Sequence, residues 1–149
     1  MNLIGSGIRK FQNQNMVHLD LKPENIIIHP IRGITFIDFF SLQKEIISSK
    51  CYTPSTSFGT LYYMSPEMYF DNRFHKNTDL WSLGLIGFML SERFHPFQVQ
   101  GVTYANMREY VGESLTAQRR DDKYILDICD LLHNEPNRRI NRFKNISEK

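Results

Sequence analysis

The sequence predicts a mainly α-helical protein of the α+β class, a helical bundle with one small β-hairpin. Apolar residues recur at helical spacing in Lys123–His133, and a mostly apolar stretch from Leu80 to Leu90 predicts a longer helix. Two short β-branched runs, Ile26–Ile28 and Ile34–Ile37, flank a segment that ends in Gly33, which is typical of a hairpin.

Length and composition limit the class of protein. The chain has 149 residues, 41% of them hydrophobic, as expected of one soluble globular domain. A net charge of +2 without basic runs gives no reason to expect a nucleic-acid partner. Leu80–Leu90 is too short to span a membrane, and Met1–Phe11 makes a poor signal peptide. With Cys51 and Cys129 interpreted as free thiols, we expect a cytoplasmic or nuclear protein.

The first element is predicted to be the end of a helix. Leu3, Ile8 and Phe11 recur at helical spacing, although two glycines weaken the helix by about 1 kcal/mol each. Gly5-Ser6-Gly7 could alternatively belong to a phosphate-binding loop. It lacks a third glycine and flanking strands, so the helix is favoured.

The remaining elements follow the hairpin. Ser41–Thr60 is rich in Ser and Thr and has no periodicity, which predicts a mobile loop. Thr78 or Asp79 caps the long helix, and His95-Pro96 ends it. Further helices are expected at 106–111 and 123–133.

The segment His18–Asn25 carries the most specific chemistry. It places Asp20, Lys22 and Asn25 on a short loop between apolar runs. An aspartate can orient a hydroxyl and take its proton, a lysine can neutralise phosphate charge, and an asparagine oxygen can ligate Mg²⁺. This combination favours phosphoryl transfer.

The same octapeptide resembles the catalytic loop of eukaryotic serine/threonine protein kinases, with Leu19 in place of an arginine. The resemblance extends from about Leu3 to Ile140. It implies the large C-terminal lobe of a kinase domain, because the residues before His18 lack the glycine-rich loop, strand lysine and helix glutamate of a small lobe. We therefore expect 1–149 to be a partial kinase domain without its N-lobe. Four further motifs follow in the family's order: Asp38-Phe39-Phe40, Gly59–Glu67, Asp79–Gly84 and Asn134–Arg139.

The resemblance assigns catalytic roles. Asp20 is the expected catalytic carboxylate, and the less favoured alternative is a loop aspartate that caps its own turn. Lys22 is expected to stabilise charge on the transferred group. Thr60 resembles the threonine that contacts both of them and favours serine and threonine substrates, and Glu24 is expected to face the substrate.

The resemblance also implies ATP and Mg²⁺ as cofactors. Asn25 and Asp38 are the expected metal ligands, and Lys22 joins them in binding the nucleotide. Ile27 is expected to lie under the adenine ring. From the sequence alone, Ile27 is simply a core strand residue.

Three residues are expected to hold the lobe together. Glu67 and Arg139 resemble a buried ion pair of the family. Asp79 either accepts backbone N–H bonds from the catalytic loop or acts as a plain helix cap, and the sequence does not separate these alternatives.

Two replacements fall within the motifs. Leu19 cannot receive a phosphate on the activation segment, so we expect little control by phosphorylation at Thr56. Phe40 stands where the family has a glycine, and it reaches glycine-like backbone angles only with strain of about 1–3 kcal/mol.

The favoured function is that of a serine/threonine protein kinase fragment whose complete enzyme transfers the γ-phosphoryl of ATP to protein hydroxyls. This chain alone is expected to be nearly inactive and to bind Mg·ATP weakly. The alternatives are a pseudokinase-like binding module, whose exposed surface around Ile27 and Phe39 needs a partner, and a decayed copy. Retention of Asp20, Lys22 and the two metal-ligand candidates favours the kinase.

Overall fold

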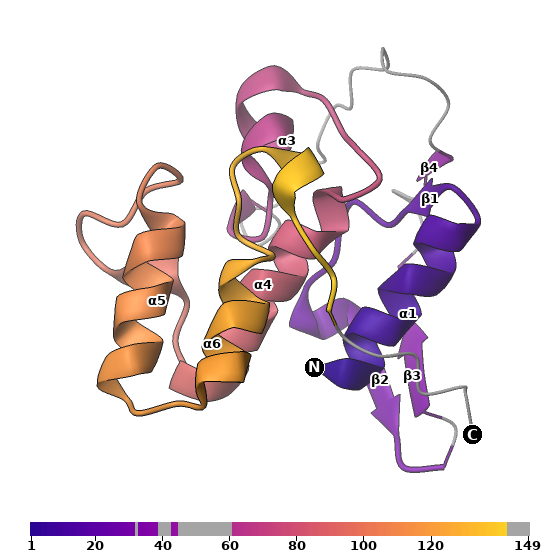
Figure 1. Ribbon diagram of the computed structural model, residues 1–149. Coiled ribbons are helices and arrows are strands. Elements are labelled where there is room, and N and C mark those ends of the chain that lie inside the picture. Colours follow the sequence, from indigo (N-terminus) through magenta and orange to yellow (C-terminus); the bar gives the residue numbers. More distant parts are fainter. Residues whose placement is uncertain (32, 39–42, 45–60, 143–149) are drawn as a thin grey trace.

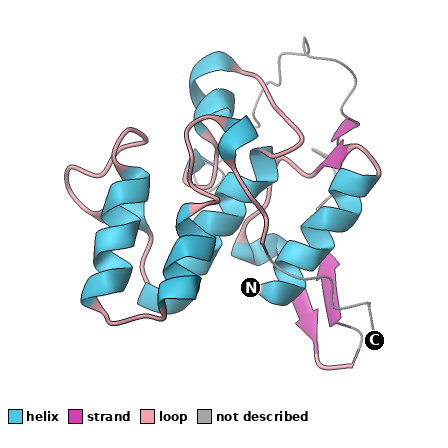
Figure 2. Ribbon diagram, viewed as in Figure 1, coloured by secondary structure: helices cyan, strands magenta, loops and turns pink. Residues whose placement is uncertain are grey.

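The computed structural model describes residues 1–31, 33–38, 43–44 and 61–142. Figure 2 shows a mainly helical molecule with its strands at one edge, which confirms the predicted fold class. The helices are α1 (Asn2–Asn13), α3 (Pro66–Asp71), α4 (Thr78–Glu92), α5 (Met107–Ala117) and α6 (Asp122–Cys129). Short 3-10 turns are η1 (Pro23–Asn25), η3 (Pro96–Gln98) and η4 (Pro136–Arg138). The strands are β1 (Met16–Val17), β2 (Ile26–His29), β3 (Gly33–Phe36) and β4 (Gln43–Lys44).

Helix α4 forms the centre of the core. Every residue from Thr78 to Phe88 is buried, which follows from a sequence that is apolar on nearly all sides. Helices α5 and α6 pack on one side of it and α1 on the other (Figure 1). Helix α4 is therefore enclosed by the other helices, and the segments at its two ends are attached to a buried core.

The predicted hairpin is present and packs against α1. Strands β2 and β3 pair antiparallel with Ile26 opposite Phe36, and Gly33 adopts a left-handed φ of 80° beside the turn. A Cβ atom on Gly7 would overlap the Phe36 ring, so α1 and the hairpin meet at a close approach. Because Gly5–Gly7 is a buried part of α1, the phosphate-loop alternative is wrong.

Several element boundaries differ from those predicted. Helix α4 begins after Asn77 instead of being capped by the side chain of Thr78 or Asp79. It ends at Glu92, because the next residue, Arg93, adopts a left-handed φ of 64° before His95-Pro96 is reached. Left-handed residues commonly end helices, so the stop comes from backbone geometry and not from the proline.

The other differences concern α5, α6 and the segment 41–60. Helix α5 continues to Ala117, whereas α6 ends at Cys129 and the buried leucines after it lie in a turn. Within 41–60, Gln43–Lys44 pairs with Met16–Val17, which contradicts a loop throughout. The other residues of that segment lie outside the described part. None of the described helices has both the length and the apolar character needed to cross a membrane.

Candidate functional site

Three of the predicted site residues meet on the loop between β1 and β2. The Asp20 carboxylate lies 3.0 Å from the Lys22 ammonium nitrogen. Asn25 is buried, and its amide nitrogen donates to the Asp20 backbone oxygen at 2.8 Å and to its carboxylate at 3.1 Å. Pro23 occupies the first position of η1, where its fixed φ suits the start of the turn that carries Asn25. The loop therefore presents an acid, a cation and an amide as one group.

Asp38 is brought next to this loop through its neighbour Ile37. The Ile37 amide donates to the Asn25 backbone oxygen at 2.9 Å, and its carbonyl lies 3.1 Å from His18 Nε2. Asp38 itself is exposed and has a left-handed φ of 63°, which aspartate tolerates better than most residues. Its carboxylate thus emerges from a backbone segment fixed to the Asn25 region.

Asp79 fixes the start of the loop. Its carboxylate accepts the His18 amide at 2.7 Å and the Leu19 amide at 2.9 Å. The loop-binding alternative is therefore confirmed and the plain cap is wrong. Burial raises the pKa of Asp79, and the two amides together with His18 oppose that shift.

Leu19 is held in a strained conformation by these bonds. Its φ is 67°, which a bulky residue adopts only when its surroundings impose it. The Leu19 side chain is buried with Val17, Met64 and Met68, and Phe74 packs on the cluster. Apolar contact through Leu19 therefore joins the loop between β1 and β2 to α3 and to the segment before it.

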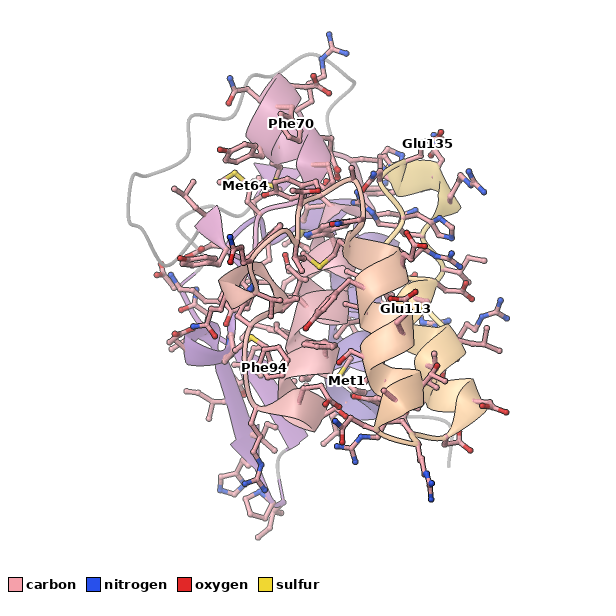
Figure 3. All side chains as sticks on the ribbon, turned by 90° about the vertical axis from the view of Figure 1, so that its left-hand side faces the viewer. Met1, Met64, Phe70, Phe94, Glu113 and Glu135 are labelled. Atoms are coloured by element: carbon pink, nitrogen blue, oxygen red, sulfur yellow. The ribbon has the colours of Figure 1, made fainter. Side chains whose placement is uncertain are left out.

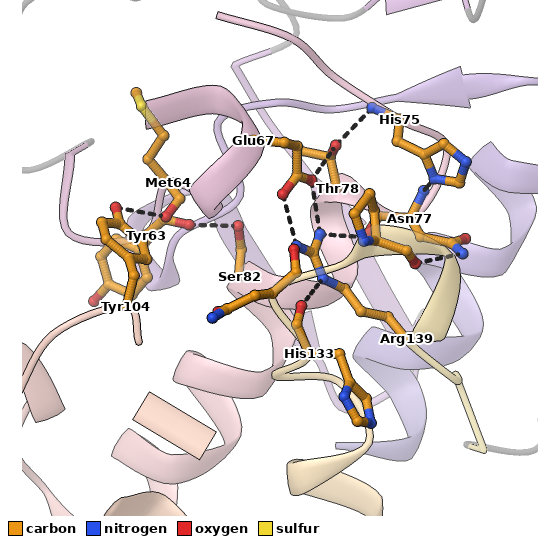
Figure 4. A network of polar contacts seen from close by, with 12 residues as sticks. Tyr63, Met64, Glu67, His75, Asn77, Thr78, Ser82, Tyr104, His133 and Arg139 are labelled. Carbon is orange, nitrogen blue, oxygen red and sulfur yellow. Dashed lines mark hydrogen bonds and ion pairs between the residues drawn. The ribbon is translucent and has the colours of Figure 1, made fainter. Parts of the chain in front are cut away.

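The expected ion pair between Glu67 and Arg139 is confirmed (Figure 4). Two Arg139 nitrogens donate to the two Glu67 carboxylate oxygens at 2.7 and 2.6 Å. Arg139 also donates to backbone oxygens, including that of His133 at 2.8 Å, and lies over the Trp81 ring. Thr78 donates its hydroxyl to Glu67 at 2.9 Å. This network ties α3 to α4 and η4.

Among the remaining predicted residues, Ile27 and Cys129 are described by the structure, and five others lie outside the described part. Ile27 is 50% exposed, so its interpretation as a core strand residue is wrong. Strand β2 is exposed from Ile27 to His29, and only Ile26 is partly buried. The free thiol at Cys129 is confirmed, and burial raises its pKa. Outside the described residues lie Phe39, Phe40, Cys51, Thr56 and Thr60.

His18 is a positioning residue to which the sequence analysis gave no role. Its Nε2 lies 3.1 Å from the Ile37 carbonyl, and its ring packs edge-on against Phe11 and Phe36. This buried ring links the loop between β1 and β2, α1 and the segment before Asp38. Its place as the first residue of the motif is the signal that identifies it.

The residues present fit Mg²⁺ held together with a nucleotide. The Asn25 amide nitrogen is turned toward Asp20, which leaves the amide oxygen as the atom for a metal, and Asp38 offers an exposed carboxylate. Mg²⁺ commonly takes one or two protein oxygens together with phosphate and water. Among the described residues, no three His, Cys, Asp or Glu side chains form a metal cluster of their own.

Comparison with known proteins gives a consistent result. The model of the protein kinase domain matches residues 1–149. The chain is 37% identical over 129 residues, 84% of its length, to inhibitor of nuclear factor kappa-B kinase subunit alpha of Xenopus tropicalis. It is 34% identical over 104 residues, 65% of its length, to MAP kinase-activated protein kinase 2 of Mus musculus. The chain spans only 16% and 25% of the lengths of these two curated relatives.

Proposed function

Since the chain belongs to the protein kinase domain family, we propose that it forms the large lobe of a serine/threonine kinase. The proposed reaction transfers the γ-phosphoryl group of ATP to a hydroxyl of a protein substrate. The observation that carries the proposal is the loop geometry: Asp20, Lys22 and Asn25 are joined by contacts of 2.8–3.1 Å, and Asp79 fixes the loop from the core.

In the proposed mechanism, Asp20 orients the substrate hydroxyl and accepts its proton. Lys22 lies beside that carboxylate and offsets the negative charge that develops on the transferred group. Asn25 holds the Asp20 backbone and carboxylate, so the acceptor oxygen is positioned before substrate binds. Serine/threonine preference is assigned to Lys22 and Thr60 by resemblance.

Mg·ATP, when bound, supplies the phosphoryl group and neutralises its charge. Asn25 and Asp38 would hold the metal, Lys22 would contact the nucleotide, and Ile27 would provide an apolar surface for the base. Because the small lobe's phosphate-binding elements have no counterpart before His18 in this sequence, we expect calorimetry on the 149-residue chain to detect very weak binding at most. Micromolar affinity would contradict that expectation.

The test uses the polypeptide as its source makes it, captured with an antibody against Lys123–His133. Its intact mass, compared with the 17.6 kDa of this chain, reports whether a small lobe is attached. Phosphate transfer to a generic protein substrate is then measured for that polypeptide and its Asp20→Asn variant, and the phosphorylated residue type is identified. We expect phosphoserine or phosphothreonine and a loss of about 10²–10⁴-fold in the variant. Transfer that is undiminished in the variant would refute the role of Asp20.

A second candidate function is a binding module without catalysis. The exposed isoleucines Ile27 (50%) and Ile28 (59%) favour it, because adjacent exposed apolar side chains mark surfaces that bind a partner. The absence of any phosphate transfer by the native polypeptide would favour this candidate over the kinase.

A further inference from the structure

An aromatic groove of about 820 Å³ lies away from the catalytic loop, between α3, η3 and the segment before α5. Its walls are Tyr62, Tyr69, Phe70, Phe97 and Tyr104. Phe70 is 65% exposed and Tyr69 is 51% exposed, so much of the aromatic surface faces solvent. The Tyr104 hydroxyl donates to the Met64 backbone oxygen at 3.0 Å, which fixes one wall.

A polar pocket of about 300 Å³ continues the groove and shares Tyr104 with it. Arg108 and Arg138 line this pocket, and Glu135 is its one acidic lining residue among those described. Figure 3 shows Phe70 and Glu135 on neighbouring elements at one end of the molecule.

The cations of this pocket are available to a ligand. Arg138 is exposed, and its side chain makes no hydrogen bond or ion pair within the described part of the chain. Within the described residues, the Arg108 side chain makes one hydrogen bond, from its Nε atom to the Cys129 carbonyl at 3.1 Å. The nearby Asp130 is already paired with Arg142 at 2.6 Å. Burial and the neighbouring arginines lower the pKa of His133, which agrees with a positive local potential.

We propose that this two-part groove binds a linear peptide of a partner protein in which an apolar side chain is followed by acidic residues. The apolar side chain fits between the rings, and the carboxylates meet Arg108 and Arg138. A purely apolar ligand would leave the two guanidinium groups unused. The inference goes beyond the proposed phosphoryl transfer, because binding here involves neither ATP nor Asp20.

The test selects binders to the 149-residue chain from a random-peptide library and measures a labelled consensus peptide by fluorescence anisotropy without nucleotide. We expect an apolar residue followed by acidic ones, with affinity that falls as salt is raised. Arg138→Glu and Phe70→Ser should each weaken binding about tenfold, corresponding to loss of one charge contact or one apolar anchor. Both side chains are exposed, so thermal melting should stay close to that of the wild type.

Matched controls do not line either part of the groove. Lys10→Glu on α1 makes the same charge change, and Leu126→Ser on α6 removes an apolar side chain of similar exposure. Both should leave affinity within about twofold. Any one of three results would overturn the proposal. The library yields no binder, the consensus contains no acidic residues, or Arg138→Glu leaves the affinity unchanged.

Discussion

Replacing Leu19 by the arginine of related kinases is expected to destabilise this protein. The Leu19 side chain is only 5% exposed and lies in an apolar cluster. Losing its burial costs about 1.5–3 kcal/mol. An unpaired guanidinium in the same place adds a desolvation cost, which the long arginine side chain reduces by reaching toward water. We therefore expect Leu19→Arg to lower the free energy of unfolding by about 3 kcal/mol.

Urea unfolding followed by the fluorescence of Trp81, the single tryptophan, measures this change because that side chain is fully buried. The melting temperature should fall by about 6–12 °C for a chain of this size. Leu19→Met is the matched control, since a volume-conserving apolar replacement costs less than about 1.5 kcal/mol. If the free energy of unfolding of Leu19→Arg lies within about 0.5 kcal/mol of the wild-type value, the buried apolar role of Leu19 is refuted.

Four further predictions concern separate parts of the chain. Arg139→Gln leaves its partner carboxylate without a cation, so we expect a loss of about 3–5 kcal/mol in chemical denaturation, and a loss under about 1 kcal/mol would contradict it. Gly7→Ala should cost about 1–3 kcal/mol because a methyl group would overlap the Phe36 ring. Gly112→Ala in α5 should be neutral or slightly stabilising, because its Cβ would lie at an ordinary contact distance of 3.4 Å from Cys129 Sγ. Burial lowers the pKa of His95 to about 4 from 6.5, so stability present above pH 6.5 is lost as pH falls toward 4. Unfolding at pH 5 should show a loss of about 1–2 kcal/mol relative to pH 7.5 from His95. The non-titrating variant His95→Asn should reduce the measured pH dependence; to the remainder, the lowered pKa of His133 contributes in the same direction and the raised pKa of Asp79 in the opposite one. Finally, Thr56→Ala and Thr56→Glu should each leave the phosphoryl-transfer rate of the full-length enzyme within about twofold of the wild-type rate. A large change in that rate would show that phosphorylation of the activation segment does control activity.

The catalytic loop could be predicted from the sequence because its residues are close together in the chain. Asp20, Lys22 and Asn25 lie within six positions, so a local pattern is enough to bring them into contact. The burial of Leu19 could not be predicted, because its partners Met64 and Met68 are distant in sequence.

The fold shows the same contrast. The helical class and the hairpin follow from periodicity and turn residues, which are local signals. The ends of α4, α5 and α6 depend on tertiary packing and on residues such as Arg93 that adopt left-handed angles. The exposure of Ile27 could not be predicted, because a run of three isoleucines contains no alternation that would indicate a solvent-facing side chain.

The bonds from Asp79 make the catalytic loop part of the same cooperative unit as the core. Asp79 belongs to α4, the most buried helix described, and it holds the amides of His18 and Leu19. Breaking those bonds would strand a buried carboxylate, so the loop cannot open locally at low cost. Its free energy of opening therefore approaches that of unfolding the whole lobe. A switch that changes the activity of such a protein must act on segments outside the loop and leave the loop geometry intact.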